Sequence, residues 1–231
     1  MSLQIKASAL FPLGGADWPR KLLIGGGTGF LLELVFVGLA YLGSEEAAFG
    51  IAPLAVMANL PAIGYVVRAY EGALRRDVAE LPEWERWPGL FTGGLVVFLI
   101  GLAYGIIPLL LLLIGLGLLV KGGIILFLGM VLMVLGVLAG TFTLFFVPMA
   151  LAGYLARRRL EAAFHPVILW GGINAVLTEY VPTYVLSIGL FIAGGMLAAI
   201  PYVGPIIWPF LWFYLLLVQA RLFGDICGKA I

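Results

Sequence analysis

Long apolar runs alternate along the chain with short groups of charged residues. Six runs are long enough to form helices that cross a lipid bilayer, because a spanning helix needs about 20 predominantly apolar residues. These runs follow one another in three pairs, which predicts three helical hairpins. The spans are expected near residues 22–43, 47–67, 90–113, 124–153, 183–200 and 206–222. We therefore predict an all-α polytopic membrane protein with a single transmembrane domain over residues 1–231.

The composition supports a membrane environment. Of the 231 residues, 63% are hydrophobic and 11% are charged, and the mean hydropathy is +1.15. Soluble domains average roughly 45–50% apolar residues. A chain this apolar could not cover its own core with polar surface, so lipid is expected to be its solvent.

The distribution of lysine and arginine predicts the orientation, since cytoplasmic loops carry the excess of these residues. With six spans and both termini in the cytoplasm, only Lys121 falls on the outer side. Twelve basic residues fall on the cytoplasmic side: Lys6, Arg20, Lys21, Arg68, Arg75, Arg76, Arg86, Arg157, Arg158, Arg159, Arg221 and Lys229. We expect a multi-pass protein of the cell (inner or cytoplasmic) membrane with both termini cytoplasmic.

Three cytoplasmic segments, residues 1–21, 68–89 and 157–180, combine charged and aromatic residues and are expected to contain short interfacial helices. In the second segment, Trp84 and Trp87 are expected at the headgroup level. Mixed charge beside two tryptophans favours a protein partner or zwitterionic headgroups over nucleic acid. The third segment begins with three consecutive arginines. These are candidates for headgroup contact, although ordinary topology signalling accounts for them equally well. The candidate interfacial or partner contacts are Leu81, Pro82, Trp84, Trp87, Arg157, Arg158 and Arg159.

A set of residues around the second segment resembles the signature of a known family. Its most distinctive element is the run Leu81-Pro82-Glu83-Trp84. The other matching residues are Gly64, Tyr65, Arg68, Gly72, Gly93 and Pro108, and the N-terminal ADWPRKLLIGG fits as well. The pattern resembles the domain of unknown function 4013 family of multi-pass prokaryotic membrane proteins. The resemblance implies the topology and leaves the function open.

Glu33 is the one acidic residue within the expected spans. A carboxylate is costly in hydrocarbon, and such residues often mark ion or proton pathways. Asn59 is expected at a comparable depth in the neighbouring span. Together they predict either a protonatable site or a protonated Glu33 that joins helices through hydrogen bonds to Asn59, Thr28 or Thr141.

Pairs of small residues four apart predict close helix packing. The three pairs are Gly25 with Gly29, Gly101 with Gly105 and Gly136 with Gly140. The glycine run at residues 24–29 is not expected to bind phosphate, because it lacks the preceding strand and the spaced Lys or acidic partner of such loops.

Residue types for catalysis are scarce. The chain has four serines, one histidine and one cysteine, and no His/Glu pair at zinc-ligand spacing. We predict no enzyme activity, no metal and no cofactor. The leading hypothesis is a structural or accessory subunit of a larger membrane assembly, or a lipid-organising component. Its expected partners are membrane lipids and a protein partner or a second copy of the chain, with no nucleic acid. The alternative is a small transporter or proton pathway centred on Glu33.

Overall fold

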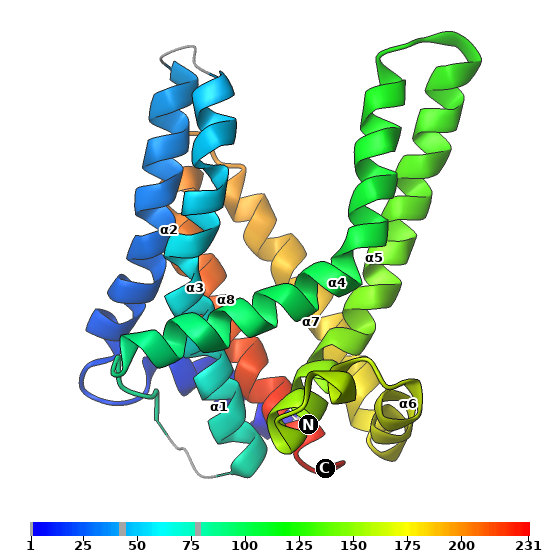
Figure 1. Ribbon diagram of the computed structural model, residues 1–231. Coiled ribbons are helices and arrows are strands. Elements are labelled where there is room, and N and C mark those ends of the chain that lie inside the picture. Colours follow the sequence, from blue (N-terminus) through cyan, green and yellow to red (C-terminus); the bar gives the residue numbers. More distant parts are fainter. Residues whose placement is uncertain (1, 42–44, 77–79) are drawn as a thin grey trace. The chain divides into compact units, whose positions relative to one another are not determined.

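The computed structural model describes residues 2–41, 45–76 and 80–231, without the side chains of residues 2–5, 32, 33, 36–53 and 55. Helices account for nearly all of this part of the chain, and it contains no strand, so the predicted all-α class is confirmed (Figure 1). The α-helices are α1 (Ser2–Leu10), α2 (Trp18–Tyr41), α3 (Glu45–Arg75), α4 (Trp87–Leu119), α5 (Gly123–Arg157), α6 (Pro166–Ala175), α7 (Leu177–Ala198) and α8 (Val203–Cys227). Two short 3-10 helices, η1 (Phe11–Leu13) and η2 (Leu160–Ala163), complete the order.

Four of these helices, α4, α5, α7 and α8, are long and apolar enough to cross a membrane. The first two predicted spans fall on α2 and α3, whose side chains are described only in part. The count of six spans and the arrangement as three hairpins therefore remain predictions. Several helices extend past the predicted spans, as α3 does by continuing to Arg75. Hydropathy marks the apolar part of a helix, whereas backbone hydrogen bonding continues into its polar flank.

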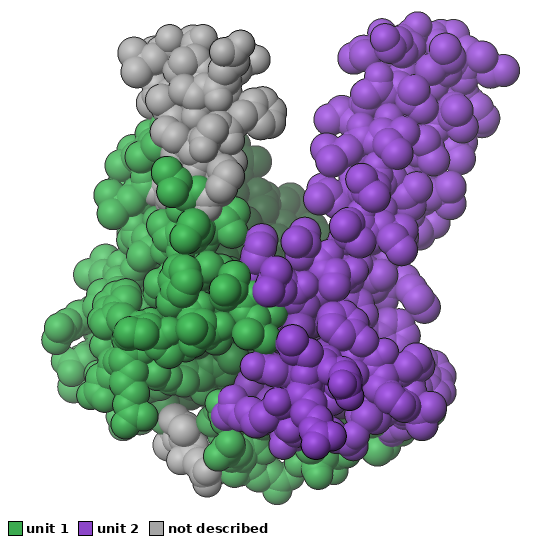
Figure 2. Space-filling model, in the orientation of Figure 1, with its two compact units in different colours: residues 1–97, 172–231 green, residues 98–171 purple. Residues whose placement is uncertain are grey.

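The chain divides into two compact units (Figure 2). Unit 1 contains residues 1–97 and 172–231, and unit 2 contains residues 98–171. In unit 1, α8 contacts α1, α2, α3 and α7. Phe213 and Leu217 of α8 are almost fully buried, so α8 is the central helix of this unit.

A close crossing joins α3 to the first turns of α4 in unit 1. A Cβ atom on Gly64 would lie 1.8 Å from the carbonyl oxygen of Leu90, and one on Gly94 would lie 1.9 Å from that of Leu60. Backbone therefore contacts backbone at this crossing, and only glycine fits at both positions.

The N-terminal segment packs on α8. The Tyr214 hydroxyl donates a hydrogen bond to the carbonyl of Ala9 at 2.5 Å. Phe11 is buried, and the Arg221 guanidinium lies 5.3 Å from the centre of its ring, which is cation–π geometry. Part of the segment predicted to be interfacial thus belongs to the packing of unit 1.

In unit 2, α5 lies side by side with the second half of α4 (Figure 1). Glycines form this contact. A Cβ on Gly129 would lie 2.9 Å from the carbonyl oxygen of Gly115, and one on Gly136 would lie 2.8 Å from Leu112. Outside this stripe many large apolar side chains are exposed, including Leu113 and Phe127. Such a surface suits contact with lipid.

Candidate functional site

A cluster in unit 1 fixes the segment that links α3 to α4. The hydroxyl of Tyr65 donates a hydrogen bond to the carbonyl of Pro82 at 2.7 Å. The Tyr65 ring also stacks on the Trp84 indole, with centroids 4.2 Å apart. The Trp84 indole N–H donates to the carbonyl of Lys21 at 3.2 Å. We call Lys21, Tyr65, Arg68 and Leu81–Trp84 the signature cluster, because most of these residues belong to the family-like pattern.

Lys21 is buried, with 7% of its surface exposed. Its ammonium donates a hydrogen bond to the carbonyl of Leu81 at 3.0 Å and forms an ion pair with Glu83 at 2.5 Å. A buried charge is costly unless it is paired and hydrogen-bonded. Both requirements are met here, and the Glu83 side chain remains 61% exposed at the edge of the cluster.

Residues 80–86, the part of the linking segment that the structure describes before α4, form no helix that would satisfy their backbone carbonyls. The Arg68 guanidinium donates to the carbonyl of Glu85 at 2.9 Å and to that of Glu83 at 3.4 Å. Together with Lys21 and Tyr65, this arginine supplies donors for four carbonyls between residues 81 and 85. Backbone carbonyls that are shielded from water need hydrogen-bond partners, and at Leu81 and Pro82 side chains of α2 and α3 supply them.

The structure brings together the predicted contact residues Leu81, Pro82, Trp84 and Trp87, with the Trp84 and Trp87 rings 5.4 Å apart. Leu81 is buried, whereas Trp87 is 47% exposed. Leu81 and Trp84 thus pack within unit 1, and Trp87 is the better placed for an outside contact. Contact of these residues with a partner or with headgroups remains a prediction.

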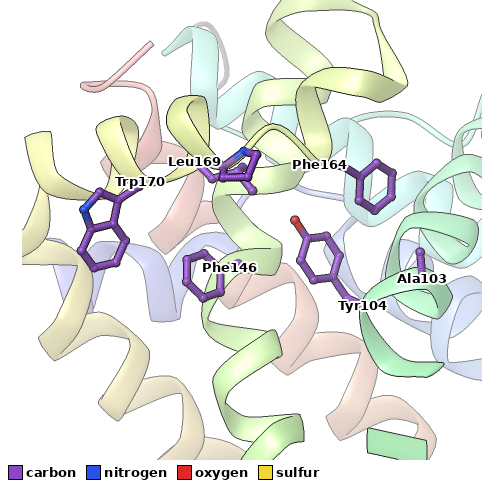
Figure 3. Close-up of a pocket in the computed structure, with 7 residues that line it drawn as sticks. Ala103, Tyr104, Phe146, Phe164, Leu169 and Trp170 are labelled. Carbon is purple, nitrogen blue, oxygen red and sulfur yellow. The ribbon is translucent and has the colours of Figure 1, made fainter. Parts of the chain in front are cut away.

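Unit 2 contains a second candidate site, an apolar pocket of about 490 Å³. We call it the aromatic pocket. Its lining comes from α4, from α5, and from the chain between η2 and the middle of α6. The lining residues are Ala103, Tyr104, Phe146, Phe164, Pro166, Leu169 and Trp170. In the view of Figure 3, Trp170 and Phe164 lie at opposite sides of the group, with Phe146 and Tyr104 between them.

The polar groups of this pocket are few. The Tyr104 hydroxyl donates a hydrogen bond to the carbonyl of Ala163 at 2.6 Å. The Tyr104 ring stacks on Phe164 at 5.5 Å. These two contacts hold Ala163, the last residue of η2, and the following Phe164 against α4. The lining offers rings and aliphatic groups, which suit a hydrocarbon ligand better than a polar solute.

The basic triplet, Arg157–Arg159, lies between α5 and the pocket-lining segment that follows. Arg157 is the last residue of α5. Arg158 adopts the left-handed conformation (φ 54°), and its N–H donates to the carbonyl of Tyr154 at 2.7 Å. This turn ends the helix and leads the chain towards Phe164. Positive charge at a helix C-terminus is also favourable for the helix dipole.

Glu33 lies outside the residues whose side chains are described, so its predicted pairing with half-buried Asn59 remains a prediction. Among the predicted packing glycines, Gly25 lies against Phe213, Gly29 against Pro209, Gly136 against Leu112 and Gly140 near Pro108. A Cβ at Gly101 or at Gly105 would meet nothing within 4 Å.

Sequence reasoning missed the crossing formed by Gly64 and Gly94. Gly64 belongs to the family-like pattern, but its close contact is with Leu90 of α4. A rule based on pairs of small residues four apart in one helix does not predict which residue of another helix lies against them. The aromatic pocket was also missed. Trp170 lies within residues 157–180, which were predicted to be interfacial, yet nothing in the sequence linked it to Tyr104.

The fold and its apolar helices define an all-helical, multi-pass membrane protein. The family model described as protein of unknown function (DUF4013) matches residues 47–203. The chain belongs to this family, as its signature residues indicated. The matched region includes Tyr65, the run Leu81–Trp84 and the whole of unit 2. Comparison with curated proteins gave no match, and comparison with solved structures gave none either.

Proposed function

We propose that the protein is a non-catalytic component of the membrane that organises lipid. The observation that carries this proposal is the surface of α4 and α5. In the most apolar window of each helix, only 11% is buried within the protein. The two helices contact each other along a narrow glycine stripe, and many of their apolar side chains outside it are exposed and can order acyl chains.

The aromatic pocket supports the same function. It adds a concave apolar surface of about 490 Å³ to the exposed helix faces. Its one hydroxyl, on Tyr104, already donates to a backbone carbonyl. The lining thus presents no acid, base or nucleophile to a bound molecule, in keeping with a binding role rather than catalysis.

The site of action would be the cytoplasmic membrane, with both termini in the cytoplasm. This orientation is supported by the distribution of basic residues. Under the six-span topology, twelve of them lie on the cytoplasmic side and only Lys121 lies on the outer side. Fusion of green fluorescent protein or alkaline phosphatase to the C-terminus tests the orientation. A fluorescent fusion and an inactive phosphatase are expected, and the reverse result would overturn it.

Extraction from native membranes into polymer-bounded nanodiscs tests the lipid-organising role. The expected result is a particle whose lipid composition differs reproducibly from that of the bulk membrane. Stoichiometric co-migrating proteins would favour an accessory subunit of a larger assembly. A lone protein with bulk lipid composition and Glu33-dependent proton flux in liposomes would favour the transport alternative.

A further inference from the structure

The aromatic pocket has the size and lining of a ligand site. Small-molecule sites commonly enclose about 300–1,000 Å³ and are mainly apolar, with a few polar groups. Phe146, Leu169 and Trp170 supply apolar surface. The bonded hydroxyl of Tyr104 leaves little to recognise a polar solute. The part of a ligand that enters this pocket is therefore hydrocarbon.

The pocket lies towards the C-terminal end of the apolar part of α5, where Phe146 contributes to its lining. Phe146 precedes Arg157 by eleven residues, or about 16 Å at the rise of an α-helix. The other wall, from Phe164 to Trp170, follows the basic triplet in the chain. Trp170 is 54% exposed. Tryptophan and arginine at the end of a span are typical of the headgroup level, so the wall from Phe164 to Trp170 is expected at that level and Phe146 deeper in the hydrocarbon.

The charged residues that precede the pocket wall in the chain suggest the chemistry of the ligand's other end. Residues 154–166 contain three arginines and one acidic residue, Glu161. Arg157 and Arg159 are both exposed. Arginine binds phosphate oxygens through paired N–H groups. An apolar pocket whose wall follows two exposed arginines closely in the chain complements a molecule that is apolar at one end and anionic at the other.

We propose that the aromatic pocket binds one acyl chain of an anionic membrane phospholipid, and that Arg157 and Arg159 hold its headgroup. This inference rests on the proposed lipid-organising function and names the lipid class and the binding residues. Zwitterionic phospholipid and a helix of another protein are the competing occupants, and the experiment below separates them.

The test uses the full-length protein in phosphatidylcholine vesicles. Increasing fractions of phosphatidylglycerol or phosphatidylcholine with brominated acyl chains are added, because bromine quenches tryptophan fluorescence on contact. The fluorescence of Trp170 is obtained as the difference between the tryptophan fluorescence of the wild type and that of Trp170→Phe. Trp208→Phe in unit 1 serves as the matched control. Brominated phosphatidylglycerol is expected to quench the Trp170 signal at a lower mole fraction than brominated phosphatidylcholine.

Two sets of variants test the assigned residues. Arg157→Gln with Arg159→Gln is expected to weaken the preference for phosphatidylglycerol roughly thirtyfold, since each juxtamembrane arginine adds about 1 kcal/mol of attraction to anionic lipid and two are removed. Ala103→Phe, at an exposed lining position, narrows the pocket and is expected to remove the preference of Trp170 quenching for brominated phosphatidylglycerol. Leu102→Phe adds an aromatic ring next to the pocket lining and is expected to leave quenching unchanged.

Equal quenching by both lipids, or a preference that survives both arginine substitutions, would overturn the proposal in favour of a zwitterionic occupant. Absence of quenching by either lipid would show that protein covers the pocket. If native nanodiscs still carry a distinctive lipid composition in either case, the lipid-organising function stands and only the pocket assignment fails. If they do not, both fail.

Discussion

Tyr65 and Trp84 stack with their rings 4.2 Å apart and 14° from parallel, joining α3 to residues 80–86, which form no helix or strand. The same tyrosine donates its hydroxyl to the carbonyl of Pro82. One side chain of α3 therefore fixes both the backbone and the main aromatic group of the run Leu81–Trp84. This relationship gives the signature residues a structural role independent of any ligand.

The stacking predicts unequal effects for two neighbouring tryptophans. Trp84→Ala removes the contacts with Tyr65 and Phe213 and the hydrogen bond to Lys21, and we expect a loss of about 2–4 kcal/mol of stability. Trp87→Ala removes a ring that is 47% exposed, and a much smaller loss is expected. Thermal unfolding in detergent can be followed with a thiol-reactive dye, because Cys227 is the one cysteine and is fully buried. Equal shifts in Tm would contradict the assigned packing.

The ammonium of Lys21 is buried and has two partners, the carbonyl of Leu81 and the carboxylate of Glu83. We predict that the bond to Leu81 contributes more to stability than the ion pair with Glu83. Lys21→Met leaves the carbonyl of Leu81 without this donor, and an unsatisfied buried acceptor costs about 1–3 kcal/mol. Glu83→Gln keeps a hydrogen-bond acceptor beside Lys21 at a position that is 61% exposed, so a smaller loss is expected. The same thiol-dye assay compares them. A larger loss for Glu83→Gln would show that the ion pair, rather than the backbone contact, dominates.

The crossing of α3 and α4 predicts strict limits on two glycines. Gly64→Ala and Gly94→Ala place a methyl group within 2 Å of a backbone carbonyl, so we expect loss of folded protein on size-exclusion chromatography. Gly93→Ala is the matched control, because a Cβ there meets nothing within 4 Å. Since alanine favours a helix over glycine by about 1 kcal/mol, this control is expected to be neutral or stabilising. Folded Gly64→Ala protein of unchanged Tm would exclude the crossing.

These glycines show what a sequence pattern can and cannot predict. Apolar runs predict helices because hydropathy is a property of each segment alone. A spacing rule finds small faces, but which face meets another helix depends on the tertiary arrangement. Gly101 and Gly105 satisfy the rule and meet nothing within 4 Å, whereas Gly94 has a close contact with α3. The aromatic pocket is harder still, because Tyr104 and Trp170 come from segments that only the fold brings together.

Two tyrosines each donate a hydrogen bond to a backbone carbonyl in a different part of the chain. We predict that removing either hydroxyl speeds hydrogen exchange only in the segment that it holds. Tyr104 bonds the carbonyl of Ala163 beside the aromatic pocket, and Tyr214 bonds that of Ala9 in the N-terminal segment. A hydrogen bond of this kind contributes about 1 kcal/mol net, which corresponds to roughly fivefold faster local opening. In hydrogen–deuterium exchange, Tyr104→Phe should accelerate exchange in residues 160–170 and leave residues 6–14 unchanged.

Tyr214→Phe should give the opposite pattern, so each variant controls for the other. The comparison also bears on the pocket, because η2 and the start of α6 form its wall. If Tyr104→Phe accelerates exchange at both segments, or at neither, then the hydroxyl does not hold that wall in place. If only residues 160–170 respond, the bond from Tyr104 to Ala163 stabilises the pocket before any ligand is bound. Binding to a preformed site avoids the cost of ordering it, and this variant should then also weaken the quenching of Trp170 by brominated phosphatidylglycerol.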